Sequence, residues 1–212
     1  MKIHPADQRS PEWFTARLGK LTGSRAKDML ATIKNGEAAP RRNLRVQLVL
    51  ERLTGRSQEN GYQSHAMQQG IEREVDAFAV YEGLTGTLLT SSGFLEHDTL
   101  MAGCSLDGHV GDFEGLVEIK CPQAATHLDY LKTGTIPGDY YKQITHALWI
   151  TGAQWCDWLS FNPDFPEPLQ VKLVRVVRSE AAIAAYETAA TAFLAEVDQE
   201  LETVQQLAAV PV

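Results

Sequence analysis

The chain has 212 residues, of which 44% are hydrophobic and 22% charged, a composition that is typical of a globular protein. Its formal net charge of −8 argues against a protein that coats DNA through a uniformly basic surface. Three cysteines without a CxxC pair exclude a disulfide framework and a four-thiolate metal site, and no apolar run reaches the length of a membrane span. We therefore expect a cytoplasmic protein with free thiols, without a secretory signal and without a membrane partner.

The first 86 residues carry mainly helical patterns. Ser10 is suited to cap a helix whose first turn contains Pro11, and Gly19 marks the end of that helix. An arginine-rich segment that stops at Gly55 predicts another helix and is locally basic in an acidic chain. Helices are expected over residues 11–18, 23–33, 40–54 and 65–86.

Strand patterns follow, separated by turns rich in glycine and aspartate. Strands are expected within residues 86–97, 99–110, 115–122, 154–163 and 169–178, and helices over 127–134, 138–152 and 179–208. This order predicts an α/β (α+β) fold, with a central mixed β-sheet of about five strands flanked by helices. No linker divides the chain, so residues 1–212 are expected to form a single domain.

The segment GLVEIKCP places Glu118 and Lys120 on the same face of a strand, because side chains alternate along a strand. Asp107 lies eleven residues before Glu118, and the turn-rich sequence between them is short enough for a hairpin. Two carboxylates, with the backbone carbonyl of Ile119, form an oxygen set that Mg²⁺ favours, and a nearby lysine can orient or deprotonate water. An ordinary strand-face ion pair fits these residues equally well, so the pattern alone leaves both interpretations open.

Five blocks in chain order point further: EWFTARLGKLTGSRA, GIEREVDAF, CSLDGHV, LVEIKCP and YYKQITHALWITG. They span residues 12–152 and resemble the lambda exonuclease (YqaJ-like viral recombinase) family of the PD-(D/E)xK nuclease superfamily, with the lambda-type alkaline exonucleases most similar. The resemblance implies a restriction-endonuclease-like core and a metal-dependent DNA exonuclease. It also implies Mg²⁺ as the cofactor, with two ions expected and Mn²⁺ as a substitute.

The resemblance assigns roles to residues of the matching blocks. Asp107 and Glu118 are expected to bind the metal, and Lys120 to activate the attacking water. Glu74 is expected near the metal or linked to it through a water. Gln143 is expected to place the water or the scissile phosphate; the alternative is a plain solvated helix residue.

Arg17 and Ser24 match the residues that hold a terminal 5′-phosphate in that family. Ser24 is expected at the start of a helix, where free N–H groups favour an anion, and Arg17 can meet a phosphate with two hydrogen bonds. A plain helix cap at Ser24 and a surface charge at Arg17 are the alternatives. Some family members have a second glutamine where this chain has Thr145, which removes one expected polar contact.

Members of the family degrade one strand of duplex DNA from a 5′ end and leave a 3′ single strand. They form ring-shaped homotrimers around DNA and act with a single-strand annealing protein. The resemblance therefore implies three partners: double-stranded DNA ends, two further copies of the chain, and an annealing recombinase. The tunnel candidates are Arg41, Arg42 and Arg45, and the acidic surplus would then face outward. A phage or prophage protein in the bacterial cytoplasm is expected.

Two alternatives to a 5′→3′ exonuclease are another nuclease of the superfamily, resolvase-like or restriction-like, and a catalytically silent DNA-end binding protein. A restriction-like enzyme would cut closed circular DNA, whereas an enzyme that requires an end would not. The complete set of two acids and one lysine argues against the silent protein.

Overall fold

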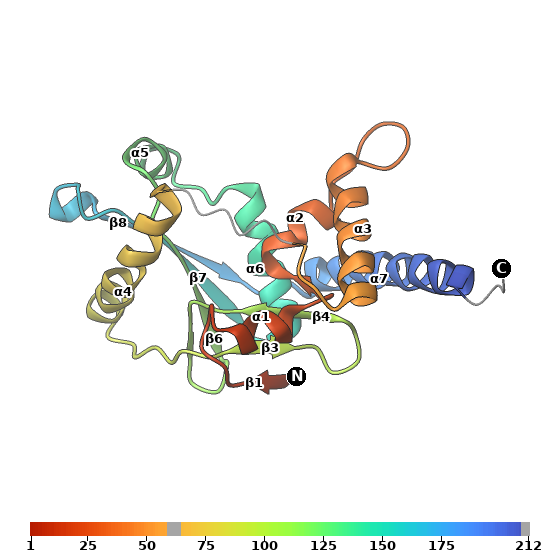
Figure 1. Ribbon diagram of the computed structural model, residues 1–212. Helices are drawn as coiled ribbons and strands as arrows, with labels where there is room; N and C mark the ends of the chain where they lie inside the picture. Colours follow the sequence, from red (N-terminus) through yellow and green to blue (C-terminus); the bar gives the residue numbers. More distant parts are fainter. Residues whose placement is uncertain (59–64, 209–212) are drawn as a thin grey trace.

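The computed structural model describes residues 1–58 and 65–208 (Figure 1). The helices are α1 (Pro11–Arg17), η1 (Gly23–Arg25), α2 (Ala26–Met29), α3 (Ala39–Thr54), α4 (His65–Thr85), α5 (Ala124–Thr133), α6 (Gly138–Thr151), η2 (Glu167–Leu169) and α7 (Glu180–Ala208). The strands are β1 (Lys2–His4), β2 (Leu21–Thr22), β3 (Phe94–Glu96), β4 (Ala102–Ser105), β5 (Gly108–Val110), β6 (Gly115–Lys120), β7 (Trp155–Phe161) and β8 (Val171–Val177). Within the two described ranges, no helix combines the length and apolar character that crossing a membrane requires.

The strands form two four-stranded mixed sheets, where the sequence predicted one sheet of about five strands. One sheet has the order β1-β3-β4-β2 and the other β5-β6-β7-β8. β4 and β5 follow each other in the chain yet belong to different sheets, so the chain changes sheets at Leu106 and Asp107. The mixed α/β architecture with flanking helices is as predicted. The strand count differs because one predicted strand is divided between the two sheets, as β4 and β5, and because the short strands β1 and β2 were not predicted.

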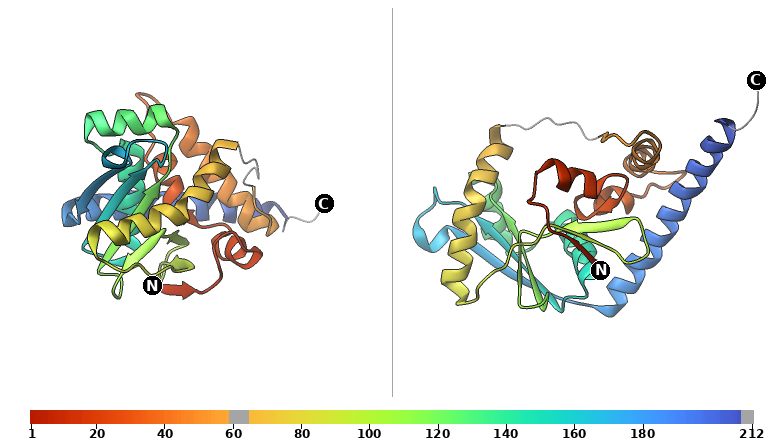
Figure 2. Two further views of the ribbon diagram at one scale, coloured as in Figure 1. Left: turned by 90° about the vertical axis from the view of Figure 1, so that its left-hand side faces the viewer. Right: turned by 60° about the horizontal axis from the view of Figure 1, so that its bottom comes forward.

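Helices cover both faces of the sheet β5-β6-β7-β8. On one face, Val117 and Ile119 of β6 pack with Ala77 and Tyr81 of α4. On the other face, Leu116 belongs to the larger core, which includes buried residues of α6 and α7. Figure 2 shows α4 and the long α7 on opposite sides of the molecule. Alternation along β6 therefore directs its polar side chains away from α4 and toward α6.

A buried carboxylate fixes α4 on the sheet. Asp157 of β7 is 1% exposed, and it accepts a hydrogen bond from the Tyr81 hydroxyl at 2.8 Å. Arg175 of β8 donates to both oxygens of the same carboxylate, each at 2.7 Å. Burial and the nearby Asp157 raise the pKa of Tyr81, so the phenol stays protonated and donates. This network holds the helix that carries Glu74.

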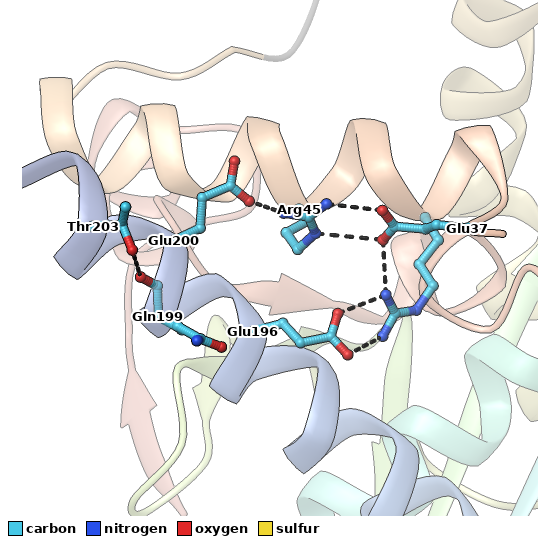
Figure 3. Close-up of polar contacts among 7 residues, drawn as sticks. Glu37, Arg45, Glu196, Gln199, Glu200 and Thr203 are labelled. Atoms are coloured by element: carbon cyan, nitrogen blue, oxygen red, sulfur yellow. Dashed lines mark hydrogen bonds and ion pairs between the residues drawn. The ribbon is translucent and has the colours of Figure 1, made fainter.

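Ion pairs join α3 to α7 along one side of the molecule. Arg41 donates to both oxygens of Glu196, at 2.7 and 2.9 Å. Arg45 pairs with Glu37 at 2.8 Å and also contacts Glu200. Figure 3 shows Arg45 between Glu37 and Glu200, where α3 passes over α7. Bidentate arginine–carboxylate pairs of this kind fix the orientation of the two helices.

The N-terminal elements agree with the sequence only in part. Ser10 caps α1, because its Oγ accepts a hydrogen bond from the Trp13 N–H at 3.2 Å. Gly19 follows α1 with a φ of +68°, which favours glycine. The helix predicted over 23–33 is wrong in length: a single 3₁₀ turn is followed by a four-residue helix that ends at Met29. β1 and β2, with three and two residues, were not predicted because such short strands show no alternation.

Candidate active site

The hairpin predicted between Asp107 and Glu118 is present. β5 and β6 pair antiparallel with Gly108 opposite Val117, so the same register puts Asp107 opposite Glu118. Asp107 Oδ2 accepts a hydrogen bond from the Ile119 N–H at 2.6 Å, which holds this carboxylate against β6. Two acids therefore lie side by side at the point where the chain crosses between the two sheets.

Glu118 is the buried centre of this group and is 4% exposed. Its Oε1 accepts a hydrogen bond from Gln143 Nε2 of α6 at 2.7 Å and also contacts Lys120 Nζ. Burial raises the pKa of Glu118 to about 7; Lys120 opposes the rise, and the Asp107 and Glu74 carboxylates add to it. A buried carboxylate with two acidic neighbours favours a bound cation, and shifted pKa values of this kind gather at functional sites.

Lys120 lies beside Glu118 with its side chain 23% exposed and its Nζ 5.3 Å from the centre of the Tyr140 ring. Burial lowers the pKa of Lys120, but the Glu118 and Asp107 carboxylates raise it by more, so the pKa stands above its usual value. The ammonium group is therefore charged. In this state it is suited to orienting water and neutralising phosphate charge rather than to removing a proton.

Glu74 reaches the same region from α4. Glu74 and Ile119 line two adjoining clefts, of about 350 and about 620 Å³; Asp107 lines the smaller and Lys120 the larger. The Glu74 side chain is 36% exposed, and its Oε2 accepts a hydrogen bond from Arg9 Nη2 at 2.9 Å. Sequence reasoning missed Arg9, because it stands in a loop and belongs to no recognisable motif.

The donor atoms of the site fit Mg²⁺. Within residues 1–58 and 65–208, no three His, Cys, Asp or Glu side chains gather closely enough to hold a metal by themselves. Mg²⁺ takes one or two protein carboxylates and completes its octahedron with waters and phosphate oxygens. Asp107 and Glu118 are such a pair, and the backbone carbonyl of Ile119 between Glu118 and Lys120 could supply a further oxygen. The three cysteines are free thiols outside this donor set.

The family follows from a comparison with family models. A model described as the YqaJ-like viral recombinase domain matches residues 12–154, about two thirds of the chain. The chain belongs to this family. The match includes all the residues predicted to bind metal or the 5′-phosphate, together with Lys120 and Gln143. It ends before β7, so β7, β8 and α7 lie outside it.

Solved structures extend the likeness of this YqaJ-family chain beyond the matched domain. An alkaline exonuclease from Laribacter hongkongensis (LHK-Exo) is 42% identical to this chain and superposes on it with a TM-score of 0.86. The alignment covers 94% of this chain and 98% of the chain of that enzyme. The same enzyme in complex with dAMP gives a TM-score of 0.87 over the same coverage and identity. A phage-related exonuclease from Haemophilus somnus 129PT shares the fold, with a TM-score of 0.67 at 15% identity over 87% of this chain and 96% of its own. No curated protein matches the chain.

A small pocket in the YqaJ domain brings the two predicted phosphate residues next to the carboxylate site. It has a volume of about 140 Å³, and Arg17, Ser24, Ser105, Glu118 and Gln143 line it. Ser24 and Gln143 also line the larger cleft, so the pocket and the cleft adjoin. An anion in the pocket would therefore lie beside the residues that surround Glu118.

Ser105 was not singled out from the sequence, although it stands two residues before Asp107 in the CSLDGHV block. Its Oγ accepts hydrogen bonds from Trp13 Nε1 at 2.9 Å and from Arg17 Nη1 at 3.4 Å. The Arg17 guanidinium also lies over the Trp13 ring, 4.1 Å from its centre. Trp13 and Ser105 therefore hold Arg17 at the pocket.

The helix-start argument for Ser24 is weakened by the structure. Ser24 belongs to η1, a three-residue 3₁₀ turn, and α2 adds only four more residues. So short a helix has only a small dipole at its N-terminus. The Ser24 Oγ lies 3.3 Å from Thr22 Oγ1. Ser24 can still donate hydrogen bonds to an anion from its hydroxyl and its backbone N–H. Any anion binding at Ser24 would therefore depend on these hydrogen bonds and not on a helix dipole.

The three tunnel candidates on α3 are not equivalent. Arg41 and Arg45 have side chains 21% and 20% exposed and are paired with acids of α7 and with Glu37. Arg42 points to solvent and is exposed. Two of the three arginines predicted to meet DNA are therefore engaged in holding α3 on α7, which leaves Arg42 best placed for an external phosphate.

Proposed function

We propose that the chain is a Mg²⁺-dependent 5′→3′ exonuclease that digests one strand of linear double-stranded DNA. It releases 5′-mononucleotides and leaves a 3′ single strand for recombination by strand annealing. The observation that carries this proposal is the group at Glu118: a buried carboxylate with Asp107 on the neighbouring strand, Lys120 beside it and Gln143 donating from α6. Membership of the YqaJ-like family and the likeness to an alkaline exonuclease support the same activity.

Each residue of the site has a separate proposed role in phosphodiester hydrolysis. Asp107, Glu118 and the Ile119 carbonyl would hold the metal, which when bound would supply Lewis-acid stabilisation and an activated water. Lys120 orients the attacking oxygen and neutralises charge that develops on the phosphate. The water oxygen bonds to phosphorus, the bond from phosphorus to the departing 3′ oxygen breaks, and that oxygen takes up a proton. Gln143 and Glu74 place the phosphate and the water.

The direction of digestion is proposed to come from the small pocket beside the carboxylates. Arg17 and Ser24 bind the terminal 5′-phosphate there, so that the first phosphodiester of the strand lies at Glu118. The complex of the Laribacter enzyme with dAMP, a 5′-mononucleotide, is consistent with a site for such a product. Residues 1–212 are proposed to act as a single exonuclease domain with the PD-(D/E)xK arrangement of acids and lysine.

The proposal is tested with three DNA substrates: supercoiled circles, linear duplex with 5′-phosphate ends and linear duplex with 5′-hydroxyl ends. With Mg²⁺ or Mn²⁺, the wild-type protein should release acid-soluble nucleotides from linear duplex and leave supercoiled circles intact. Cutting of the circles would support a restriction-like or resolvase-like nuclease instead. Glu118→Gln and Lys120→Ala should abolish release, and full activity in either variant would refute the site assignment.

The end preference is tested separately. A 5′-phosphate should speed digestion by the wild-type protein, and Arg17→Ala should remove that preference. Equal wild-type rates on the two kinds of end would remove the phosphate pocket from the proposal while leaving the nuclease site in place.

The assembly around this site is also proposed from the family resemblance. A homotrimer would enclose the DNA, with Arg42 of each copy at the duplex and the acidic surface outside. A single-strand annealing recombinase would take the 3′ strand, and the setting is the cytoplasm of a phage-infected or prophage-carrying bacterium. Mass measurement in solution tests the trimer.

A further inference from the structure

Arg9 is a cation that lines the larger cleft and that the proposed mechanism does not use. It stands between β1 and α1, and its Nη2 donates to Glu74 Oε2 across 2.9 Å. The described residues that line this cleft of about 620 Å³ include two cations, Arg9 and Lys120. Lys120 is held at Glu118, whereas the Arg9 side chain is 44% exposed. Arg9 is therefore the more accessible of the two positive charges that line this cleft.

The backbone at Arg9 is in an unusual conformation. Its φ is +73°, in the left-handed region that favours glycine, and the chain uses glycine at comparable positions such as Gly19 and Gly55. Such strain persists where the surrounding structure enforces it and is concentrated at ligand-binding sites. An exposed ion pair with Glu74 offers little compensation, because solvent screens it. The conformation therefore points to a role for the arginine side chain beyond this pair.

The residues on both sides of Arg9 are anchored. Gln8 Nε2 donates to the carbonyl of Leu106, next to Asp107, at 2.6 Å. The Ser10 N–H donates to the Asp7 carbonyl at 3.1 Å, and Ser10 Oγ caps α1. The backbone of Arg9 is thus fixed beside the carboxylate site while its side chain reaches across the cleft.

We propose that Arg9 binds a backbone phosphate of the DNA strand that enters the cleft. The guanidinium exchanges the Glu74 carboxylate for the phosphate, to which it can donate two hydrogen bonds. Glu74 holds Arg9 in position until DNA arrives and is then free to turn toward Asp107 and Glu118. The inference rests on the proposed function, since it assumes a DNA strand as the substrate of this cleft.

The test compares Arg9→Ala, Arg9→Gly and Arg9→Lys with the wild-type protein. Binding of a 5′-phosphorylated duplex is measured in EDTA at several salt concentrations, so that no cleavage is needed. Loss of one phosphate contact should lower the slope of log affinity against log salt by about 0.7–0.9, and affinity should fall about tenfold in the Ala and Gly variants. Arg9→Lys should keep the slope because it keeps the charge. Lys2→Ala is the matched control: an exposed N-terminal cation paired with Glu96 outside the cleft, whose loss should leave both values unchanged.

Arg9→Gly separates binding from folding. Glycine relieves the left-handed strain, so this variant should melt at or above the wild-type temperature and still bind DNA more weakly. In steady-state digestion with Mg²⁺, KM should rise about tenfold with kcat nearly unchanged, the pattern for an interaction made equally in the ground and transition states. Wild-type affinity and salt slope in both Arg9→Ala and Arg9→Gly would overturn the proposal. A wild-type protein that binds duplex but never digests it would instead overturn the exonuclease proposal, and the binding comparison would still decide the role of Arg9.

Discussion

Gln143 Nε2 lies 2.7 Å from Glu118 Oε1, so one carboxylate oxygen joins α6 to β6. The same oxygen contacts Lys120 Nζ, and Glu118 is 4% exposed. A buried carboxylate without donors would be strongly unfavourable, and these two donors satisfy it from two different elements. Gln143 therefore orients the Glu118 carboxylate, and it also lines the cleft.

Gln143→Ala should therefore lower kcat for digestion of linear duplex by about tenfold to a hundredfold, because a donor that orients reacting groups is lost. Unfolding free energy should fall by about 1–3 kcal/mol, the range for a buried acceptor that loses a partner. Steady-state kinetics and thermal melting measure the two effects. Gln154→Ala is a matched control, since that amide donates only to the Gly152 carbonyl at the surface. Wild-type kcat in Gln143→Ala would contradict the assignment.

The raised pKa of Glu118 predicts a pH dependence of stability in metal-free protein. Burial raises the pKa of Glu118 from its usual 4.5 to about 7 in the folded protein, so between these values the folded state binds more protons than the unfolded state. Stability then falls as pH rises from about 4.5 to 7 and the buried carboxylate becomes charged. In chemical denaturation across this range, the stability of the wild-type protein relative to Glu118→Gln should therefore fall as pH rises.

Mg²⁺ should reverse this loss. The metal needs the deprotonated carboxylate, so its stabilising effect on the melting temperature should grow as pH passes through about 7. Glu118→Gln and Asp107→Asn should respond little to Mg²⁺ at any pH. An equal response in all three proteins would place the metal elsewhere.

The sequence predicted the parts of this site that lie on regular elements. Alternation in β6 and turn residues before it were sufficient for the Asp107–Glu118 hairpin, because a two-strand pairing depends on local chemistry. The partners of Arg41 and Arg45 could not be predicted in this way. Glu196 and Glu200 stand 155 positions later in the chain, and only the packing of α3 on α7 brings them together.

Arg9 and the division into two sheets escaped prediction for related reasons. A left-handed backbone is usually predicted from a glycine, and Arg9 is not a glycine, so its sequence gives no sign of this conformation. Leu106 and Asp107 continue the pattern of β4, so the crossing between sheets leaves no break in the sequence. Long-range geometry, rather than local preference, determines both.

The pairing of α3 with α7 predicts a measurable coupling. Arg41→Ala, Glu196→Ala and the double variant should give an interaction free energy of about 0.5–1 kcal/mol in chemical denaturation, the upper range for a partly exposed bidentate pair. High salt should reduce it. Arg42→Ala, on the exposed side of the same helix, should show no coupling with Glu196→Ala.

The same variants rank the predicted contacts with DNA. Arg42→Ala should reduce the salt dependence of duplex binding, whereas Arg41→Ala should change it less because that side chain is already paired. The reverse order would mean that DNA displaces the α7 acids from Arg41.

His146 connects α6 to both neighbouring layers and predicts a second, opposite pH effect. It is fully buried; its Nε2 lies 2.9 Å from the Gly103 carbonyl of β4 and its Nδ1 lies 2.7 Å from the Tyr186 hydroxyl of α7. A carbonyl only accepts, so in the neutral ring Nε2–H donates to Gly103 and Nδ1 accepts from Tyr186. Burial lowers the pKa of His146 to about 4, with the Gly103 hydrogen bond opposing the shift.

Between pH 6.5 and 4 the unfolded chain therefore binds a proton at His146 that the folded chain does not, and stability falls as pH falls, by about 3 kcal/mol at most. His146→Gln should be less stable than wild type at pH 7 yet lose less stability between pH 7 and 4, as measured by chemical denaturation. Tyr186→Phe is the control: it removes one hydrogen bond at every pH and keeps the titrating ring, so its stability should change with pH in parallel with that of the wild type. Parallel curves for His146→Gln and wild type would show that His146 does not titrate in this range. Because α6 carries Gln143, His146→Gln should also slow digestion at pH values where the variant is fully folded.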